Sequence, residues 1–383
     1  MNIPIDRLTA ADYPEAIALL DLAFSVSSGP HDFQALLPGI YQPTDRHMRC
    51  NYAIRIDGAI RAMVGVFPIA WRPGGLDLPI AGIGGVCCHP DFREQKLVTR
   101  LLARAVDDMS TGGTPLSFLG GQRQRYGYCG YEVAGNLRSY SLTSANLRHT
   151  FTDTPAVTLR PLADCPQALP AMQRWYTTLP LACDRDAVDF PALIRNWLAR
   201  VSVGFVGDRP VGYLIATGNG ALVTELAGES DAILVDMLRV HMAARDNATV
   251  TVRHSGISLS LERRLDQFAE SVACGSSGNW RIMDWPRVLS TLFAARALRG
   301  PLVAGAVRVA IDGGPVLALQ VTDGTATVTV SADAADLTVD PFTATRLFFG
   351  PLRPSDVIAL PAAAAILDAW CPLPLAISRA DTC

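Results

Sequence analysis

One stretch of the chain, Gly84 to Leu102, constrains the fold more than any other. It begins as an apolar strand, is interrupted by Pro90, and continues through an arginine-led turn into an amphipathic helix. The apolar residues on one face of that helix are Leu97, Leu101, Leu102 and Ala105. A strand that leads to a helix N-terminus favours anion binding, because free backbone N–H groups and the positive end of the helix dipole face the ligand. The stretch therefore predicts a pyrophosphate site.

A second informative segment, Arg125 to Glu132, reads Arg-Tyr-Gly-Tyr-Cys-Gly-Tyr-Glu. The first stretch resembles the core motif of the GNAT N-acetyltransferase superfamily, Arg/Gln-x-x-Gly-x-Gly/Ala between a strand and a helix. The second resembles that superfamily's later Tyr-x-x-x-Gly-Phe/Tyr block. The resemblance implies acetyl-coenzyme A as co-substrate and an acetyl acceptor that is a primary amine, in a small molecule or a lysine side chain. The residue order also suits acyl-coenzyme A better than a nucleotide.

The chain departs from the motif inside the turn. The glycine positions fall on Lys96 and Val98, and a position that is often basic falls on Glu94. A Cβ obstructs close approach of backbone to phosphate, so these side chains are expected to weaken the cradle, with Lys96 compensating by charge.

The resemblance also assigns the coenzyme-binding residues. Backbone groups at the strand end would contact the pantetheine arm, from Val86, Cys87 and Cys88. The turn and the helix start would hold the pyrophosphate, from Arg93, Glu94, Gln95, Lys96, Leu97, Val98 and Thr99. The same strand carries Gly82, Gly84 and Gly85. Glycine inside a strand marks a bulge or the close approach of a ligand or another backbone.

Acetyl transfer to an amine needs a neutral amine and a proton for the leaving thiolate. The resemblance places Tyr126 as the proton donor, and a phenol with a reference pKa of about 10 stays neutral at pH 7. It also places the C-terminal carboxylate, here on Cys383, as the general base. Asp381 is a competing base. The tail from Cys371 is apolar as far as Ile377, so it is expected to pack rather than fray.

The length of 383 residues predicts two or three domains. Residues 1–150 form the expected catalytic GNAT domain, which includes a hairpin around Asp57-Gly58. Residues 151–284 are expected to be a degenerate GNAT-like domain without a phosphate turn. Residues 285–383 resemble a sterol-carrier-protein-like α+β domain. The expected fold class is α/β (α+β), and the three-part order resembles the enhanced intracellular survival protein group.

Composition narrows the class of protein further. The net charge of −3 gives no nucleic-acid footprint, and no apolar run reaches the length of a membrane span, so a soluble, cytoplasmic protein is expected. Nine scattered cysteines and six dispersed histidines predict neither a disulfide framework nor a metal site. The resemblance implies a homo-oligomer, a hexamer or a dimer. The alternative function is a non-catalytic protein that binds coenzyme A or an apolar ligand through a decayed pyrophosphate turn.

Overall fold

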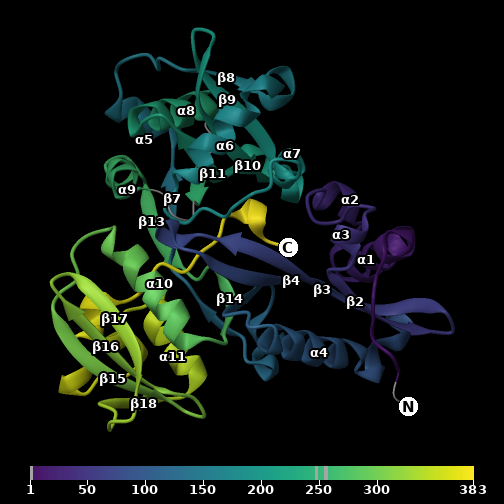
Figure 1. Ribbon diagram of the computed structural model, residues 1–383. Helices are drawn as coiled ribbons and strands as arrows, with labels where there is room; N and C mark the ends of the chain where they lie inside the picture. Colours follow the sequence, from purple (N-terminus) through teal and green to yellow (C-terminus); the bar gives the residue numbers. More distant parts are fainter. Residues whose placement is uncertain (1–2, 246–248, 254–257) are drawn as a thin grey trace.

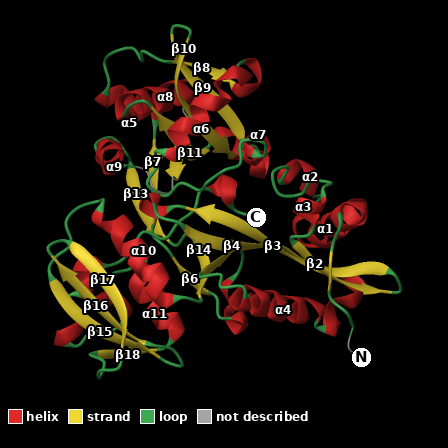
Figure 2. Cartoon of the chain, in the orientation of Figure 1, coloured by secondary structure: helices red, strands yellow, loops and turns green. Residues whose placement is uncertain are grey.

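The computed structural model describes residues 3–245, 249–253 and 258–383. Three β-sheets organise the chain, two of seven strands and one of four (Figure 1 and Figure 2). Helices pack on the faces of the sheets, so the expected α/β (α+β) class with three bodies is confirmed. No helix within the described ranges is long and apolar enough to cross a membrane.

The first sheet is mixed. In spatial order its strands are β1 (Asp6–Arg7), β2 (Asn51–Ile56), β3 (Ala59–Trp71), β4 (Leu78–Cys88), β5 (Leu116–Leu119), β14 (Gly278–Ile282) and β6 (Glu132–Ala134). Only β4 and β5 are parallel. The β2–β3 hairpin turns at Asp57 (φ 52°) and Gly58 (φ 78°), and two positive φ values are what a tight hairpin turn requires. The predicted Asp-Gly hairpin is confirmed.

Helices cover both faces of the first sheet. One face packs against α1 (Tyr13–Ser28) and α2 (Phe33–Leu36), with α3 (Asp45–Met48) beside them. The other face packs against α4 (Leu97–Thr111). The predicted apolar face of α4 is confirmed, since its four residues are buried together with Met109. Burial of each large aliphatic side chain stabilises the fold by roughly 1.5–3 kcal/mol, which ties the helix start firmly to the sheet.

The second sheet is built from the middle of the chain. In spatial order its strands are β8 (Thr158–Pro161), β9 (Arg200–Val206), β10 (Arg209–Thr217), β11 (Leu222–Gly228), β12 (Val250–Arg253), β7 (Leu137–Leu142) and β13 (Ser271–Gly275). Its only parallel pair among these is β11–β12. The helices of this part are α5 (Ser144–Thr150), α6 (Leu169–Thr177), α7 (Phe190–Leu193), α8 (Asp231–Ala243) and α9 (Leu259–Asp266).

The two sheets exchange one strand. Read from β1 and from β8, they have the same order, and in each the sixth place is filled by a strand from the other half of the sequence. Strand β14 inserts between β5 and β6, where Trp280 is fully buried and pairs with Phe118 and Glu132. Strand β7 takes the equivalent place beside β12. Strand pairing therefore crosses residue 150, because β7 joins the second sheet and β14 joins the first. No strand pair among the described residues crosses residue 284, and the limits at residues 150 and 284 stay predictions.

The third body follows directly. Helix α10 (Trp285–Ala297) precedes a sheet in the order β17 (Thr325–Ser331), β16 (Val316–Thr322), β15 (Gly305–Ile311) and β18 (Leu337–Val339). Its remaining α-helices are α11 (Pro341–Phe349), α12 (Pro354–Val357) and α13 (Leu367–Trp370). One continuous apolar cluster joins this body to the first sheet through Trp71, Trp280 and Trp285. The third body is thus packed on the first rather than tethered to it.

The C-terminal segment, residues 371–383, leaves the third body and ends between the two large sheets, beside β4 (Figure 1). Its apolar part is buried, so the predicted packing of the tail is confirmed. Three hydrogen bonds hold its backbone: Leu373 N–H to the Phe348 carbonyl (2.8 Å), Ser277 Oγ to the Leu375 carbonyl (2.7 Å), and Asn196 Nδ2 to the Ala380 carbonyl (3.0 Å).

Candidate active site

Strands β4 and β5 separate in the middle of the first sheet. Their pairing runs only from Ala81–Ser117 to Ile83–Leu119, whereas β4 continues along β3 as far as Cys88. Along residues 84–88, no strand in the described part of the chain pairs with the edge of β4 that faces β5. Unpaired strand groups are a template for an extended ligand. The sequence-predicted Val86, Cys87 and Cys88 lie on this open part of β4.

The last residue of the chain lies against β4 beside the opening. A Cβ built on Gly82 would lie 2.8 Å from Cys383 Sγ, and one built on Gly84 would lie 2.8 Å from the Cys383 carboxyl carbon. Both positions require glycine, because a Cβ would meet the terminal residue at less than van der Waals distance. The expected close approach of another backbone is therefore found at Gly84, whereas at Gly82 the close neighbour is the Cys383 side chain.

The terminal carboxylate itself is unengaged. No hydrogen bond or ion pair from a residue in the described ranges reaches it. The Cys383 side chain packs in the same apolar cluster as α1, α2 and Phe67. Burial raises the pKa of the Cys383 thiol to about 12, so the thiol stays protonated at neutral pH. The carboxylate is then the charged group that this residue contributes to the site.

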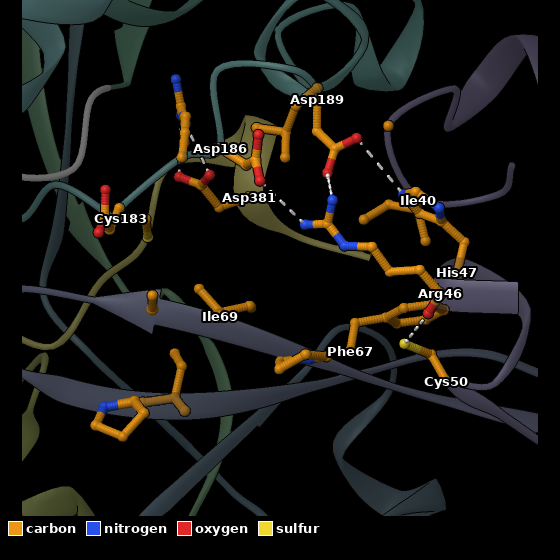
Figure 3. Close-up of a pocket in the computed structure, with 18 residues that line it drawn as sticks. Ile40, Arg46, His47, Cys50, Phe67, Ile69, Cys183, Asp186, Asp189 and Asp381 are labelled. Atoms are coloured by element: carbon orange, nitrogen blue, oxygen red, sulfur yellow. Dashed lines mark hydrogen bonds and ion pairs between the residues drawn. The ribbon is translucent and has the colours of Figure 1, made fainter. Parts of the chain in front are cut away.

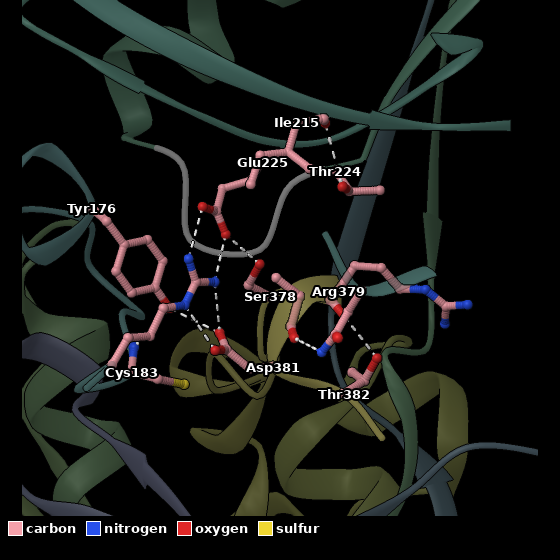
Figure 4. Close-up of polar contacts among 12 residues, drawn as sticks. Tyr176, Cys183, Ile215, Thr224, Glu225, Ser378, Arg379, Asp381 and Thr382 are labelled. Carbon is pink, nitrogen blue, oxygen red and sulfur yellow. Dashed lines mark hydrogen bonds and ion pairs between the residues drawn. The ribbon is translucent and has the colours of Figure 1, made fainter. Parts of the chain in front are cut away.

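A buried ion cluster fixes the segment two residues before the end (Figure 4). Arg185 donates to both oxygens of Asp381, at 2.8 and 2.9 Å, and to both oxygens of Glu225, at 2.9 and 2.6 Å. All three side chains are almost completely buried. Paired, hydrogen-bonded charges of this kind are stable only with good geometry on every atom. The cluster therefore specifies one position for residue 381.

Three hydroxyl groups complete the cluster. Tyr176 donates to Asp381 Oδ2 (2.8 Å), Tyr213 donates to Glu225 Oε1 (2.7 Å), and Ser378 donates to Glu225 Oε2 (2.5 Å). Burial by itself would raise the pKa of Glu225, but Arg185 and the hydroxyl donors lower it below its usual value. Because its two oxygens already accept three hydrogen bonds from these partners, Asp381 is a structural anion and is poorly suited to be the competing base.

Tyr126 lies between two short 3₁₀ turns, η4 (Arg123–Arg125) and η5 (Gly127–Cys129). It is half-buried and packs with the cluster under α4, and burial raises its pKa above that of a free phenol. Tyr131 is fully buried and its hydroxyl bonds Ser117 Oγ (2.7 Å), so it is a packing residue. Tyr128 is 60% exposed. Tyr126 and Cys383 therefore pack in clusters on opposite faces of the first sheet.

The predicted phosphate turn is present as η3 (Pro90–Gln95) followed by α4. Lys96 is the N-cap of α4 and has φ 55°, ψ 26°, the left-handed conformation that glycine adopts readily. Its side chain is exposed, as are those of Arg93, Glu94, Gln95 and Thr99. The Lys96 side chain makes no capping hydrogen bond, so within the described residues the first turn of α4 has backbone N–H groups without an N-cap acceptor.

Val98, the second departure from the motif, packs toward the core under α4. Its Cβ therefore does not stand over the end of the helix. An open helix N-terminus with exposed basic side chains fits a pyrophosphate, and the open edge of β4 fits an extended arm. Of the predicted coenzyme-binding residues, those of the turn lie in η3 and at the start of α4, and Val86, Cys87 and Cys88 lie at the end of β4 just before them.

A cavity of about 400 Å³ opens between the first and second sheets (Figure 3). Its lining includes Asp184, Asp186, Asp189 and Asp381. Most of this negative charge is already paired: Arg46 contacts Asp189 at 2.9 Å and Asp186 at 3.6 Å, and Arg185 holds Asp381. With four aspartates and two arginines, Arg46 and Arg185, in its lining, the cavity keeps a net negative charge.

Sequence reasoning missed Arg185, Glu225 and Arg46. Their partners lie far away in the chain, and no spacing rule connects residues 185, 225 and 381. No group of three or more His, Cys, Asp or Glu residues in the described ranges could hold a metal ion; His254 lies outside those ranges. All nine cysteines are free thiols.

The N-terminal third of the chain, which contains the candidate active site strand β4 and helix α4, matches a known protein family. Residues 4–134 match the family described as acetyltransferase (GNAT) domain. That region contains β4, η3, α4, Tyr126 and all the predicted coenzyme-binding residues. A search of curated proteins found no match.

Solved structures match over nearly the whole length. A GCN5-related N-acetyltransferase from Anabaena variabilis has TM-score 0.69 at 18% identity and covers 98% of both chains. A conserved protein of Enterococcus faecalis V583, described as a probable N-acyltransferase, has TM-score 0.69 at 17% identity and covers 98% of both chains. Eis1 from Mycobacterium abscessus has TM-score 0.64 at 16% identity and covers 97% of this chain and 99% of its own. At these identities the likeness concerns the fold: both large sheets are GNAT-like.

Proposed function

We propose that this protein is an acetyl-coenzyme A-dependent N-acetyltransferase that acts on a primary amine of a small molecule or a lysine side chain. Acyl transfer in general is supported by the match of residues 4–134 to the acetyltransferase family. The observation that carries the finer proposal is the free terminal carboxylate of Cys383, seated over Gly84 where β4 and β5 separate.

Binding would be divided between two parts of β4 and α4. Backbone groups of Val86, Cys87 and Cys88 would pair with the pantetheine arm. The free N–H groups at the start of α4, with Arg93, Gln95, Lys96 and Thr99, would hold the pyrophosphate. Glu94 lies in the same turn and opposes the anion. When bound, the coenzyme supplies an activated acyl thioester.

Tyr126 would be the acid. It stays protonated at neutral pH because burial raises its pKa, and it can return a proton to the leaving thiolate. The Cys383 carboxylate would take the proton of the amine, directly or through a water. A free α-carboxyl group with a reference pKa of about 3.5 is a weak base, and desolvation in the apolar cluster of α1 and α2 would strengthen it.

The rest of the proposal concerns the other bodies. The second sheet would be a GNAT-like scaffold without its own coenzyme, residues 285–383 would be sterol-carrier-like, and the order of the three would be that of the enhanced intracellular survival group. The protein would work in the cytoplasm as a homo-oligomer, a dimer or a hexamer. Light scattering tests this: a 41.0 kDa particle at working concentration would contradict the oligomer.

The alternative is a non-catalytic protein that binds coenzyme A or an apolar ligand, and it rests on Lys96 and Val98 in the pyrophosphate turn. The left-handed backbone of Lys96 and the packing of Val98 toward the core favour the transferase over this alternative.

The test is thiol release from acetyl-coenzyme A with a panel of aminoglycosides, polyamines and lysine peptides. A chain extended by one glycine after Cys383 moves the carboxylate by about 3.5 Å, beyond hydrogen-bond reach of an acceptor amine held at the opening, while every side chain is retained. We expect the extension to be nearly as damaging to turnover as removal of the last three residues. A glycine added at the N-terminus is the control. Full turnover in the C-terminally extended chain would contradict the role of the carboxylate.

A further inference from the structure

A second cavity, of about 500 Å³, lies between the two large sheets and shares the C-terminal segment with the acidic cavity. Asp381 lines the acidic cavity, whereas Arg379 and Thr382 line this one. None of its described lining residues is an aspartate or a glutamate. Arg253, at the end of β12, is its second basic residue. We refer to it as the basic cavity.

The positive charges of the two arginines are not neutralised by any carboxylate in the described part of the chain. Arg253 Nε donates to Ser139 Oγ (2.9 Å), and the Arg379 guanidinium lies 3.8 Å from the centre of the Trp197 ring. Neither forms an ion pair with a carboxylate among the residues that the structure places, the chain terminus included. Desolvation lowers the pKa of Arg379, and the nearby charge of Arg253 lowers it further. Two positively charged side chains that line one cavity favour the binding of an anion between them.

The basic cavity adjoins both proposed catalytic groups. Gly121 lines it, and a methyl group at Gly121 would lie 3.1 Å from the Tyr126 ring. Thr382, which also lines it, directly precedes Cys383, and its hydroxyl accepts a hydrogen bond from Trp197 Nε1 (3.0 Å). A small molecule held at the arginines could thus extend toward the separation of β4 and β5.

We propose that the basic cavity binds an anionic group of the acceptor, a carboxylate or a phosphate, through Arg253 and Arg379, while the acceptor's amine reaches the opening beside Cys383. Guanidinium groups suit both anions because their planar donors match two oxygens at once. The hydroxyl groups of Thr224 and Ser277 line the same space but donate to the carbonyls of Ile215 (3.3 Å) and Leu375 (2.7 Å), so the two guanidinium groups are the donors that the anion would use. The inference rests on the proposed N-acetyltransferase function and narrows its substrate to amines that also carry an acid.

Two matched pairs of acceptors test this, each differing in one anionic group. Lysine is compared with cadaverine, which lacks the carboxylate, and phosphoethanolamine with ethanolamine, which lacks the phosphate. We expect kcat/KM for acetyl-coenzyme A-dependent thiol release to favour the acidic member by roughly 10- to 100-fold in at least one pair. The pair that shows the preference identifies the anion. Equal rates within both pairs would overturn the proposal.

Variants locate the preference. Arg253→Gln and Arg379→Gln should each remove most of it, mainly through KM, whereas Arg264→Gln, at an exposed position on α9, is the matched control. Arg253 is exposed at a strand end, so its replacement keeps the fold even if Arg379→Gln weakens it. A preference that survives in Arg253→Gln, or that is lost equally in Arg264→Gln, would contradict the site.

Calorimetric titration of the same four compounds separates the two proposals. Binding of lysine or phosphoethanolamine that depends on Arg253, without thiol release from any amine, would keep the anion site and overturn the transferase. Thiol release without any dependence on the acidic group would do the reverse.

Discussion

The two large sheets share one strand order but treat the helix after their fourth strand differently. In the first sheet this helix is α4, whose N-cap is Lys96 in the left-handed conformation with no capping side chain. In the second sheet it is α8, whose N-cap Ser230 accepts a hydrogen bond from the backbone N–H of Ile233. The N-terminus of α4 thus lacks a capping side chain, whereas Ser230 caps the N-terminus of α8. A single capping residue can therefore determine whether the backbone N–H groups at a helix N-terminus are available to an anion.

The fourth strands differ in a second way. Strand β4 makes room for the chain terminus with Gly82 and Gly84, whereas β11 holds the same segment with the buried Glu225 and its partner Arg185. The first sheet therefore provides the residues of the proposed chemistry, and the second sheet holds the C-terminal segment in position.

Tyr126→Phe should lower kcat by roughly 10²- to 10⁴-fold, because it removes the proposed proton donor of the first sheet. Coenzyme affinity and unfolding free energy should hardly change, since the ring is retained. Steady-state thiol release and coenzyme titration measure these quantities. The exposed Tyr128→Phe is the control, and equal losses in the two variants would argue against a special role for Tyr126.

Arg185→Met should destabilise the protein by about 3–5 kcal/mol, because it leaves two buried carboxylates without their cation. Denaturant unfolding measures this. The matched control is Arg46→Met: Arg46 also pairs with two aspartates, but its side chain is 62% exposed, so about 0–1 kcal/mol is expected. Similar losses of unfolding free energy in both variants would mean that the buried cluster does not hold the C-terminal segment in position.

Acid should weaken the second sheet through Glu225. Its folded pKa lies below its usual value of 4.5, so the stability it contributes is present above that pH and is lost as the pH falls through the folded pKa. Each unit of depression corresponds to roughly 1.4 kcal/mol. The difference in unfolding free energy between wild type and Glu225→Gln should therefore shrink as the pH falls below 4.5. Parallel curves would contradict the prediction.

The smallest effects concern the two helix caps. Ser230→Ala should cost about 1 kcal/mol of stability and leave coenzyme affinity unchanged, because α8 is not part of the site. Lys96→Gly should weaken coenzyme binding by roughly 2- to 5-fold through loss of a charge at a helix start. Calorimetry of coenzyme binding compares them. Tighter binding by Lys96→Gly would show that the side chain only obstructs.

Local signals predicted the first sheet well. The apolar spacing from Leu97 predicted the buried face of α4, and Asp57-Gly58 forms the expected turn with positive φ. The strand exchange could not be predicted, because a short strand has the same alternating pattern whichever sheet it joins. The ion cluster and both cavities depend on residues that meet only in the folded chain. The tail was predicted to pack, but nothing in it revealed that Asp381 would be fixed by Arg185.

The strand exchange also determines when the first sheet can be completed during synthesis. During synthesis the first sheet lacks the strand between β5 and β6 until β14 has left the ribosome. About 140 residues separate β6 from β14, so at roughly 5–20 residues per second the gap stays unfilled for roughly 7–30 s. Two strand edges and the pocket for Trp280 are exposed for that time, which is long compared with the microseconds of a hairpin. Until β14 is synthesised, the first half of this chain thus exposes strand edges and apolar surface, and a chain that ends before residue 278 cannot complete the first sheet.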